Sequence, residues 1–294
     1  MKNPLRFQTL RLAAPLFVAL ALTGCASNGP VASDCISSVA NASYTGPYKG
    51  VENNLAPADI ARDAYCADRF KSVRYPGGFV AIYGSSRIVE ENRQADPAIR
   101  AANDRLYQGV RAFAARWTRA YARQYPVMTG AGPGLMEAGS RGAMEAGGPS
   151  IGYTTYYGPS RDKGDASLVF QTYRDKTGSA RTIITDGLIF SSVAIREYEM
   201  IAHSAAIVIA PGGTGTEWET FQILETMKSN QLKPVPIYLV GRKDVYWRSF
   251  DQRLDAMAAI GTIRKSEITD LVTYVDEPED VVELLRRKLA LPPD

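Results

Sequence analysis

The sequence predicts an α/β protein in which helices pack on both faces of one parallel, doubly wound sheet. Short runs made almost wholly of apolar residues, such as 79–83 and 206–210, are typical of strands buried on both faces. These runs alternate along the chain with longer segments that carry apolar residues at helical spacing. Because strands that alternate with helices favour a parallel sheet, we expect residues 75–294 to form it as a single domain.

Residues 1–24 are predicted to be a lipoprotein signal peptide that takes no part in the fold. Lys2, Arg6 and Arg11 form a basic start, and residues 12–22 are an apolar core too short to cross a bilayer comfortably. Residues 22–25, Leu-Thr-Gly-Cys, resemble a bacterial lipobox, so we expect cleavage before Cys25 and acylation of its thiol. The alternative is an ordinary signal peptide that happens to contain a cysteine.

The residue after the lipobox bears on localisation. Ala26 rather than aspartate follows Cys25. By resemblance to other lipoproteins this favours the outer membrane of the bacterial cell envelope, with the lipid-anchored protein facing the periplasm. Membrane association is therefore expected through lipidated Cys25.

The predicted signal peptide, or leader, also accounts for the net charge of the chain. The chain has 34 Lys and Arg against 31 Asp and Glu, a net charge of +3. Because the leader holds three basic residues and no acidic one, the mature chain carries no net charge. Without a basic field we expect no binding to nucleic acid.

The chain has three cysteines and one histidine. If Cys25 carries lipid, Cys35 and Cys66 remain as an even pair in an oxidising compartment, where disulfides persist. We expect a disulfide between them, the alternative being two free thiols with Cys66 buried on a helix face. His203 is the only histidine, so no Cys/His metal spacing exists and no metal site is expected.

The segment ahead of the sheet, residues 25–74, is predicted to be a tether and wrapping arm with a helix. Residues 26–57 are rich in Ser, Asn, Gly, Pro and Ala, whereas residues 57–73 carry apolar side chains in a rough helical stripe. The sheet then begins, and its first elements are a strand at 78–83, a turn at 84–87 and a long helix at 97–125.

The middle of the chain repeats the pattern of strand, glycine turn and helix. A strand from Val127 enters a turn with Gly130, Gly132 and Gly134, a weak signal by itself because glycine turns after strands are common. Residues 158–181 are polar and glycine-bearing, consistent with a loop at the mouth of a site. The other elements expected here are a helix to about residue 146, strands at 151–157 and 182–185, a short strand within 168–173 and a helix at 190–204.

The strand at 206–210 leads into the most informative stretch of the chain. Pro211 stops the strand because it cannot donate a ladder hydrogen bond. The glycines that follow allow a tight turn, and a helix is expected from Thr216, with Trp218, Phe221, Leu224 and Met227 on its apolar side. The remaining predicted elements are a strand at 235–240, a helix at 246–260, a strand at 271–275 and a closing helix at 278–289.

A strand, a glycine turn and a helix N-terminus together present free N–H groups and partial positive charge to an anion, usually a phosphate. A Walker loop is excluded because no lysine follows Gly215 until Lys228, and a dinucleotide fingerprint would lie earlier in the chain. We expect the phosphate to be held by Gly212, Gly213, Thr214, Gly215 and Thr216.

The nine residues from Pro211 to Glu219 match the pattern Pro-Gly-Gly-x-Gly-Thr-x-x-Glu. This motif resembles the signature of the LOG family, the cytokinin riboside 5'-monophosphate phosphoribohydrolases once mislabelled lysine decarboxylases. The resemblance covers most of residues 77–290 and implies a Rossmann-like fold of the LOG type. It also implies a homodimer with the site near the interface.

Two further segments resemble the family. Tyr83-Gly-Ser-Ser86 is similar to its Gly-Ser-Ser turn, which adds Gly84 and Ser85 to the expected substrate-binding residues. Residues 129–143 are similar to its Gly-Gly-Gly-x-x-Gly-Leu-Met segment, with Ala131 in place of one glycine, which adds Gly132 and Gly134.

Arg196 and Glu219 are the predicted catalytic pair. Ile195-Arg196-Glu197 falls where the family has Met-His-Glu-Arg-Lys, so Arg196 takes the place of the catalytic arginine. Glu197 replaces the usual lysine, a charge reversal that bears on phosphate binding and on which nucleotide is preferred. Each member of the pair also has a purely structural interpretation. Thr216-x-x-Glu219 is also a capping box, and an isolated arginine is more often a surface salt-bridge partner.

Three other polar residues near the motifs are given no catalytic role. Glu199 and Glu217 are expected to be solvated helix positions, and His203 a helix-end residue.

The expected reaction is hydrolysis of the N-glycosidic bond of a nucleoside 5'-monophosphate, of the AMP or cytokinin riboside monophosphate type, releasing base and ribose 5-phosphate. Glu219 would stabilise the positive charge that builds on the sugar or activate water, and Arg196 would orient the substrate. No cofactor is expected, because a pyridoxal decarboxylase would need a Schiff-base lysine and none lies in these motifs. The rival hypothesis is a catalytically silent, lipid-anchored sensor of a nucleotide or sugar phosphate, which export favours.

Overall fold

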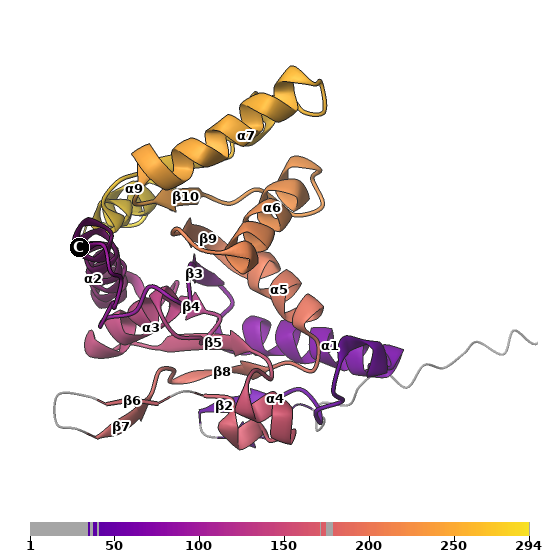
Figure 1. The fold of residues 1–294 in the computed structure, drawn as a ribbon. Coiled ribbons are helices and arrows are strands. Elements are labelled where there is room, and N and C mark those ends of the chain that lie inside the picture. The colour runs from indigo at the N-terminus through magenta and orange to yellow at the C-terminus, as the bar shows by residue number, and fades with distance from the viewer. Residues whose placement is uncertain (1–34, 36–37, 40, 171, 175–178, 294) are drawn as a thin grey trace, which may run out of the picture.

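The computed structural model describes residues 35, 38–39, 41–170, 172–174 and 179–293 (Figure 1). The predicted signal peptide and Cys25 lie outside the described residues. Within those described ranges, no helix is long and apolar enough to cross a membrane.

The strands form one nine-stranded sheet in the order β1-β2-β8-β5-β4-β3-β9-β10-β11. Neighbouring strands pair in parallel throughout, except for β1 at the edge, which is antiparallel to β2. A separate antiparallel hairpin consists of β6 and β7. The bounds are β1 Ser38–Val39, β2 Ala42–Tyr44, β3 Phe79–Tyr83, β4 Val127–Thr129, β5 Ser150–Thr154, β6 Thr172–Arg174, β7 Ala180–Thr182, β8 Asp186–Ile189, β9 Ser204–Ile209, β10 Ile237–Val240 and β11 Val272–Val275.

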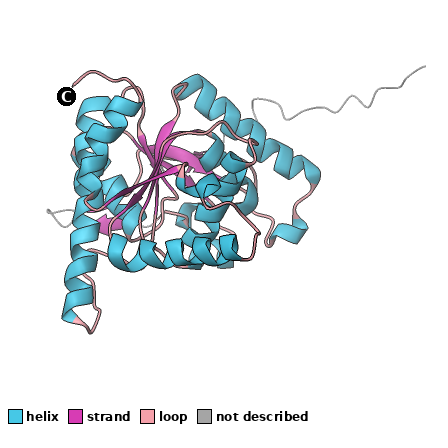
Figure 2. Cartoon of the chain, turned by 90° about the horizontal axis from the view of Figure 1, so that it is seen from above, coloured by secondary structure: helices cyan, strands magenta, loops and turns pink. Residues whose placement is uncertain are grey.

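Helices cover both faces of this sheet (Figure 2). One face packs against α2, α3 and α9, and the other against α1, α5, α6 and α7. Side chains of β3 alternate between the two apolar cores, because successive residues of a strand point to opposite faces. The helices are α1 Pro57–Arg74, α2 Pro97–Tyr121, α3 Leu135–Glu145, α4 Pro159–Lys163, α5 Val193–Ala202, α6 Thr214–Lys228, α7 Arg248–Ala259, α8 Ser266–Thr269 and α9 Val281–Lys288, with a π-helical turn Lys243–Trp247 ahead of α7. The predicted doubly wound parallel sheet is confirmed.

The strand order places a topological switch point between β3 and β9. From β3, the next strands β4, β5 and β8 extend to one side, whereas β9, β10 and β11 extend to the other. Ligands of such sheets bind where the order reverses, at the carboxyl ends of the strands. Here the two strands lead into the turns at Gly84 and Pro211, and the Ser85 N–H donates to the carbonyl oxygen of Pro211 at 3.2 Å.

The strand predicted at 182–185 is wrong beyond its first residue: Thr182 ends β7, and residues 183–185 join that hairpin to β8, Asp186–Ile189. Sequence patterns disfavour Asp-Gly at the start of a buried strand. In the structure Gly187 is needed because a Cβ there would lie 2.0 Å from the carbonyl oxygen of Gly152 on β5. Similarly, the helix expected from residue 190 begins only at Val193.

The arm ahead of the first central strand contributes β1 and β2 to the sheet and α1 to one of its faces. Asp63 of α1 accepts a hydrogen bond from the Thr45 hydroxyl and from the N–H groups of Ser191 (3.1 Å) and Ser192 (2.7 Å). Burial raises the pKa of Asp63, and these hydrogen bonds oppose the rise. Through this buried carboxyl the arm contacts the segment that begins α5.

Cys35 and Cys66 are joined by a disulfide, with their Cα atoms 5.5 Å apart and a sequence separation of 31. Cross-linking this segment to α1 restricts the unfolded chain, and a loop of this length is worth about 3–4 kcal/mol in the chain-entropy model. We therefore expect Cys35→Ser to lower the free energy of unfolding by about that amount in denaturant titrations. Reduced wild-type protein is the matched control and should unfold with the variant; equal midpoints for oxidised wild type and variant would contradict the expectation.

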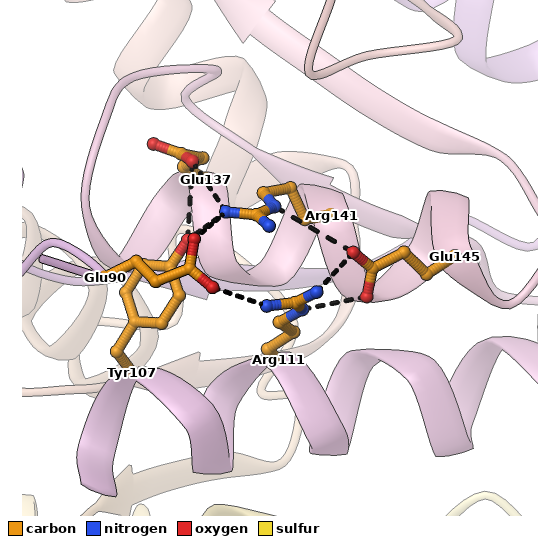
Figure 3. Close-up of polar contacts among 6 residues, drawn as sticks. All are labelled: Glu90, Tyr107, Arg111, Glu137, Arg141 and Glu145. Atoms are coloured by element: carbon orange, nitrogen blue, oxygen red, sulfur yellow. Dashed lines mark hydrogen bonds and ion pairs between the residues drawn. The ribbon is translucent and has the colours of Figure 1, made fainter. Parts of the chain in front are cut away.

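An ion-pair network links the loop after β3 to helices α2 and α3 (Figure 3). Glu90 of the loop accepts hydrogen bonds from Arg111 of α2 (2.9 Å) and Arg141 of α3 (2.6 Å). Arg111 also donates from Nε to Glu145 of α3 at 2.8 Å. Because the same loop carries the Gly84 turn, the network holds that turn against the two helices.

Candidate active site

A cleft of about 870 Å³ opens at the switch point of the sheet. It is bounded by the turns after β3 and β4, the segments after β5, the first turn and a half of α6 and the middle of α5. All but two of the expected substrate-binding and catalytic residues line it: Gly84, Ser85, Gly132, Arg196, Gly213, Thr214, Gly215, Thr216 and Glu219. Gly212 and Gly134 lie in the same turns.

The N-terminus of α6 faces this cleft with free backbone N–H groups. The helix begins at Thr214 with Gly213 as its N-cap, two residues earlier than predicted. No side chain caps it, and a Cβ on Gly213 or Gly215 would meet nothing within 4 Å. The first three N–H groups of a helix have no partner inside it, so this end can hold an anion.

The turn before α6 is held in place by side chains that contact Gly212. A Cβ on Gly212 would lie 2.1 Å from the Thr216 hydroxyl, which requires glycine at that position. The Tyr246 hydroxyl contacts the carbonyl oxygen of Gly212 at 3.1 Å and also the carboxylate of Glu217, which pairs with Arg253. Glu217 is therefore not the solvated helix position that we expected.

Another glycine shapes the opposite wall of the cleft. Gly134 has φ +72°, and a Cβ there would lie 2.3 Å from the carbonyl oxygen of Ser85. That same oxygen accepts from the Leu135 N–H at 2.9 Å, so the turns after β3 and β4 pack directly together. The backbone of these turns can thus approach a ligand from the side facing α6.

The helix boundary excludes the capping-box interpretation of Glu219. Such a box needs Thr216 as the N-cap, whereas Thr216 is the third residue of α6 and Glu219 the sixth. Instead, Glu219 Oε1 lies 3.4 Å from Nη1 of Arg196.

Arg196 is likewise no surface residue, since only 4 % of it is exposed. Its Nε donates to the carbonyl oxygen of Tyr153 at 3.1 Å, and its Nη1 contacts both Glu197 and Glu219. A Cβ on Gly130 would lie 2.6 Å from its Nη2, so the first glycine of the turn after β4 makes room for this guanidinium. The structure therefore brings together two residues that are 23 positions apart.

The environment of Glu219 favours its protonated form. Burial raises the pKa of Glu219 well above its usual range, the negative charge of Glu197 raises it further, and Arg196 opposes both. A carboxyl with a raised pKa in a cleft is typical of acid–base catalysis.

The cleft also has residues that sequence reasoning missed. Trp218, expected on the apolar side of α6, is 48 % exposed and lines the cleft with Tyr157 and Leu168. Arg87 lines it as well and has no ion pair within the described part of the chain. The Gly-Ser-Ser turn predicts where Arg87 lies, but no spacing signal marks its side chain as part of the site.

Glu199 and His203 form a buried pair behind the cleft, so the expectation that Glu199 is solvated is wrong. Glu199 Oε2 lies 3.1 Å from His203 Nε2, and His203 Nδ1 lies 3.0 Å from the Tyr153 hydroxyl. His203 is indeed the helix-end residue of α5. Burial raises the pKa of Glu199 to about 7 and lowers that of His203 to about 4.

These two pKa shifts act on stability with opposite signs. Glu199 keeps its proton in the folded state up to about pH 7 but loses it near pH 4.5 when unfolded, so its contribution to stability is lost as pH rises. His203 takes up its proton near pH 6.5 when unfolded and only at about 4 when folded, so its burial costs stability as pH falls. Between about pH 4.5 and 6.5, where both groups change their protonation, the two contributions largely cancel.

Separating the pair should reveal both slopes. With Glu199→Gln, we expect the melting temperature to rise with pH between about 4 and 6.5, because only His203 titrates. With His203→Gln, we expect it to fall between about 4.5 and 7, because only Glu199 titrates. Differential scanning calorimetry across this range measures both, and slopes of the same sign would contradict the assignment.

Across the part of the chain that the structure describes, no group of three or more His, Cys, Asp or Glu side chains could hold a metal ion.

Comparison with known proteins matches one family model. The model described as "Possible lysine decarboxylase" matches residues 136–285, which contain most of α3, α5, the turn before α6 and both acidic residues beside Arg196. None of the curated proteins matches the chain.

Several solved structures are similar to the chain. A molybdenum cofactor binding protein from Rippkaea orientalis is 19% identical with a TM-score of 0.42, covering 74% of this chain and 99% of its own. A structural-genomics target, TM1055, is 16% identical with a TM-score of 0.45, covering 71% and 99%. A molybdenum cofactor carrier protein from Chlamydomonas reinhardtii is 16% identical with a TM-score of 0.42, covering 72% and 98%.

Proposed function

Since the chain belongs to the family of possible lysine decarboxylases, the LOG family, we propose that its cleft hydrolyses the N-glycosidic bond of a nucleoside 5'-monophosphate. The products would be a free base and ribose 5-phosphate. One observation carries the proposal: the buried Arg196–Glu219 pair lies in the same cleft as the uncapped N-terminus of α6.

The substrate would bind in one orientation, with its phosphate at the start of α6 and its base at the apolar part of the cleft. The phosphate would lie at the N–H groups of Thr214, Gly215 and Thr216, where the helix end favours negative charge. Glu219 follows Thr214 by five residues, about 7.5 Å along a helix axis, a separation on the scale of a ribose 5-phosphate. The base would then lie among apolar side chains that line the cleft, including Met136, Tyr157 and Trp218.

The charged residues suit the chemistry of this bond. Its cleavage leaves positive charge on the sugar and negative charge on the departing base, and water must then add to the sugar carbon. Glu219 would donate a proton to the departing base and accept one from the attacking water. Arg196 would hold the Glu219 carboxyl in place, because it is itself fixed by Tyr153.

The name of the family does not describe the chemistry of this cleft. A pyridoxal-dependent decarboxylase forms a Schiff base with a lysine, and none of the residues that line the described cleft is a lysine. Decarboxylation of lysine is therefore not proposed.

Turnover of a panel of nucleotides tests the proposal. Purified protein is incubated with nucleoside 5'-monophosphates that differ in base, and with the matching nucleosides, and free base is separated by chromatography. We expect release from one or more monophosphates and little from nucleosides, because the nucleosides lack the group that the α6 N-terminus binds. Tight binding of monophosphates without release would favour the alternative, a catalytically silent sensor.

We further propose that the mature chain is anchored to the bacterial outer membrane through lipid on Cys25. The support is the Leu-Thr-Gly-Cys sequence behind a short apolar core. Labelling cells with a palmitate analogue should mark the protein, and Cys25→Ser should release it from the membrane fraction. Cys35→Ser is the matched control, because it removes another cysteine near the N-terminus and should leave the label in place. An unlabelled, soluble wild-type protein would overturn the proposal.

A further inference from the structure

Two buried charged side chains, Arg196 and Glu197, meet the largely buried Glu219 at one side of the cleft, and the three charges do not balance. Arg196 is 4 % exposed, Glu197 is 3 % exposed, and the side chain of Glu219 is 13 % exposed. Both glutamates face the same guanidinium, so the group would carry one net negative charge if all three were ionised. Because an uncompensated charge is costly on side chains that are largely shielded from water, such a group tends to take up a proton.

The hydrogen bonds of Glu197 also lack one donor. Its Oε1 accepts from Nη1 of Arg196, whereas its Oε2 is buried and receives no hydrogen bond from any residue that the structure describes. Nη1 of Arg196 contacts both Glu197 and Glu219, so the two carboxyl groups lie next to each other at one nitrogen atom. A proton carried by Glu219 would supply the missing donor, since a protonated carboxyl donates and an ionised one only accepts.

We propose that Glu197 and Glu219 share one proton at neutral pH, held mainly on Glu219, and that Glu197 is thereby the positioning residue that keeps Glu219 an acid. The charge count and the unpartnered oxygen support this independently of each other. The shared proton needs no assumption about the reaction, but its catalytic use rests on the proposed hydrolysis.

The other groups that face the pair favour the same state. Tyr83 of β3 faces it with a buried hydroxyl, and Tyr157 faces it from the segment after β5. Desolvation raises the pKa of each of these tyrosines, so both are uncharged at neutral pH and neither offsets the negative charge of the pair. Glu52, which accepts from the Ser192 hydroxyl at 3.0 Å beside α5, adds further negative charge on that side. Arg196 is the only cation among these described neighbours, and Glu197 engages it directly.

The proton gives the reaction a balanced path. As the bond between the sugar carbon and the base nitrogen breaks, its electron pair stays on the base, and Glu219 gives its proton to that nitrogen. Water then adds its oxygen to the sugar carbon and returns a proton to Glu219. The pair is restored, and the net change is one nucleotide and one water converted to a base and ribose 5-phosphate. Glu219 would thus act first as the acid.

Variants at Glu197 test this through the dependence of kcat/KM on pH. In the wild-type protein, kcat/KM should fall at high pH, where Glu219 loses its proton; this fall is the alkaline limb of the profile. Glu197→Gln removes the negative charge with little change of shape, so the alkaline limb should move down by about one pH unit. Glu197→Lys reverses the charge and should move it further. Glu225→Gln, an exposed position on α6, is the matched control and should leave it unchanged. An alkaline limb that stays in place or moves up in both Glu197 variants would overturn the proposal.

Infrared spectroscopy gives a second readout that needs neither activity nor a folded variant at Glu197. The spectrum of wild-type protein minus that of Glu219→Gln should show the carbonyl band of a protonated carboxylic acid at neutral pH. This carbonyl band should vanish only at higher pH, where Glu219 loses its proton. If no nucleotide is hydrolysed but the band is present, the hydrolase function fails and the shared proton stands. If the band is absent at neutral pH, the shared proton is wrong.

Discussion

Replacing Glu219 by glutamine is expected to lower kcat for nucleotide hydrolysis by about 10²–10⁴-fold, because that range is typical for loss of a positioned acid–base group. Binding should survive, since the backbone N–H groups at the start of α6 do not depend on this side chain. Steady-state kinetics and calorimetric titration with a nucleoside 5'-monophosphate measure the two quantities.

Glu225→Gln is the matched control for this substitution. It lies on the same helix, pairs with Lys228 and is 63% exposed in its side chain, so turnover should stay near wild type. A Glu219→Gln protein with undiminished kcat, and melting only slightly earlier, would show that Glu219 has no part in the chemistry.

Replacing Arg196 by methionine is expected to cost both stability and activity. Two buried carboxyl groups would lose their cation, and breaking a buried ion pair from one side typically costs about 3–5 kcal/mol. Activity should fall as well, because Glu219 would lose the group that holds it. Unfolding in denaturant gives the first quantity, and turnover of the folded fraction gives the second.

A double variant separates charge from shape in this loss. If the cost comes from uncompensated charge, Arg196→Met with Glu197→Gln should regain part of the stability lost by Arg196→Met alone. Arg264→Met, at an exposed arginine paired with Glu267, should change the free energy of unfolding by no more than about 0.5 kcal/mol. Equal losses for Arg196→Met and Arg264→Met would contradict the buried, paired role of Arg196.

The elements that the sequence predicted well are those whose local pattern matches their final surroundings. Residues 79–83 and 206–210 are apolar throughout, and β3 and β9 are buried on both faces of the sheet. The glycine turn before α6 was equally readable, because both its strand and its helix have strong local signals.

The errors arose where contacts from elsewhere in the chain override local preference. β8 contains Asp186 and Gly187, which disfavour a strand by themselves, yet Gly187 is needed where β8 packs closely on β5. Glu199 reads as a solvated helix position, and only its approach to His203 shows that it is buried.

The arrangement around Arg196 could be anticipated only in part. The motif spacing marked Arg196 and Glu219 as partners, and the structure adds that Arg196 is buried and contacts a Glu219 side chain that is only 13% exposed. That Glu197 turns towards the same guanidinium does not follow from any spacing, because adjacent helix residues normally point in different directions. The start of α6 at Thr214 was a further boundary that local pattern misplaced by two residues.

Proton NMR of a single sample tests the hydrolase function most directly. A nucleoside 5'-monophosphate in large excess over the purified protein is followed until its signals stop changing, and the same is done with Glu219→Gln. We expect the wild-type protein to convert the nucleotide into equal amounts of free base and ribose 5-phosphate over many turnovers, while the variant binds it and leaves it intact. A nucleotide that stays intact with both proteins, although it binds, would contradict hydrolysis and identify the cleft as a binding site alone.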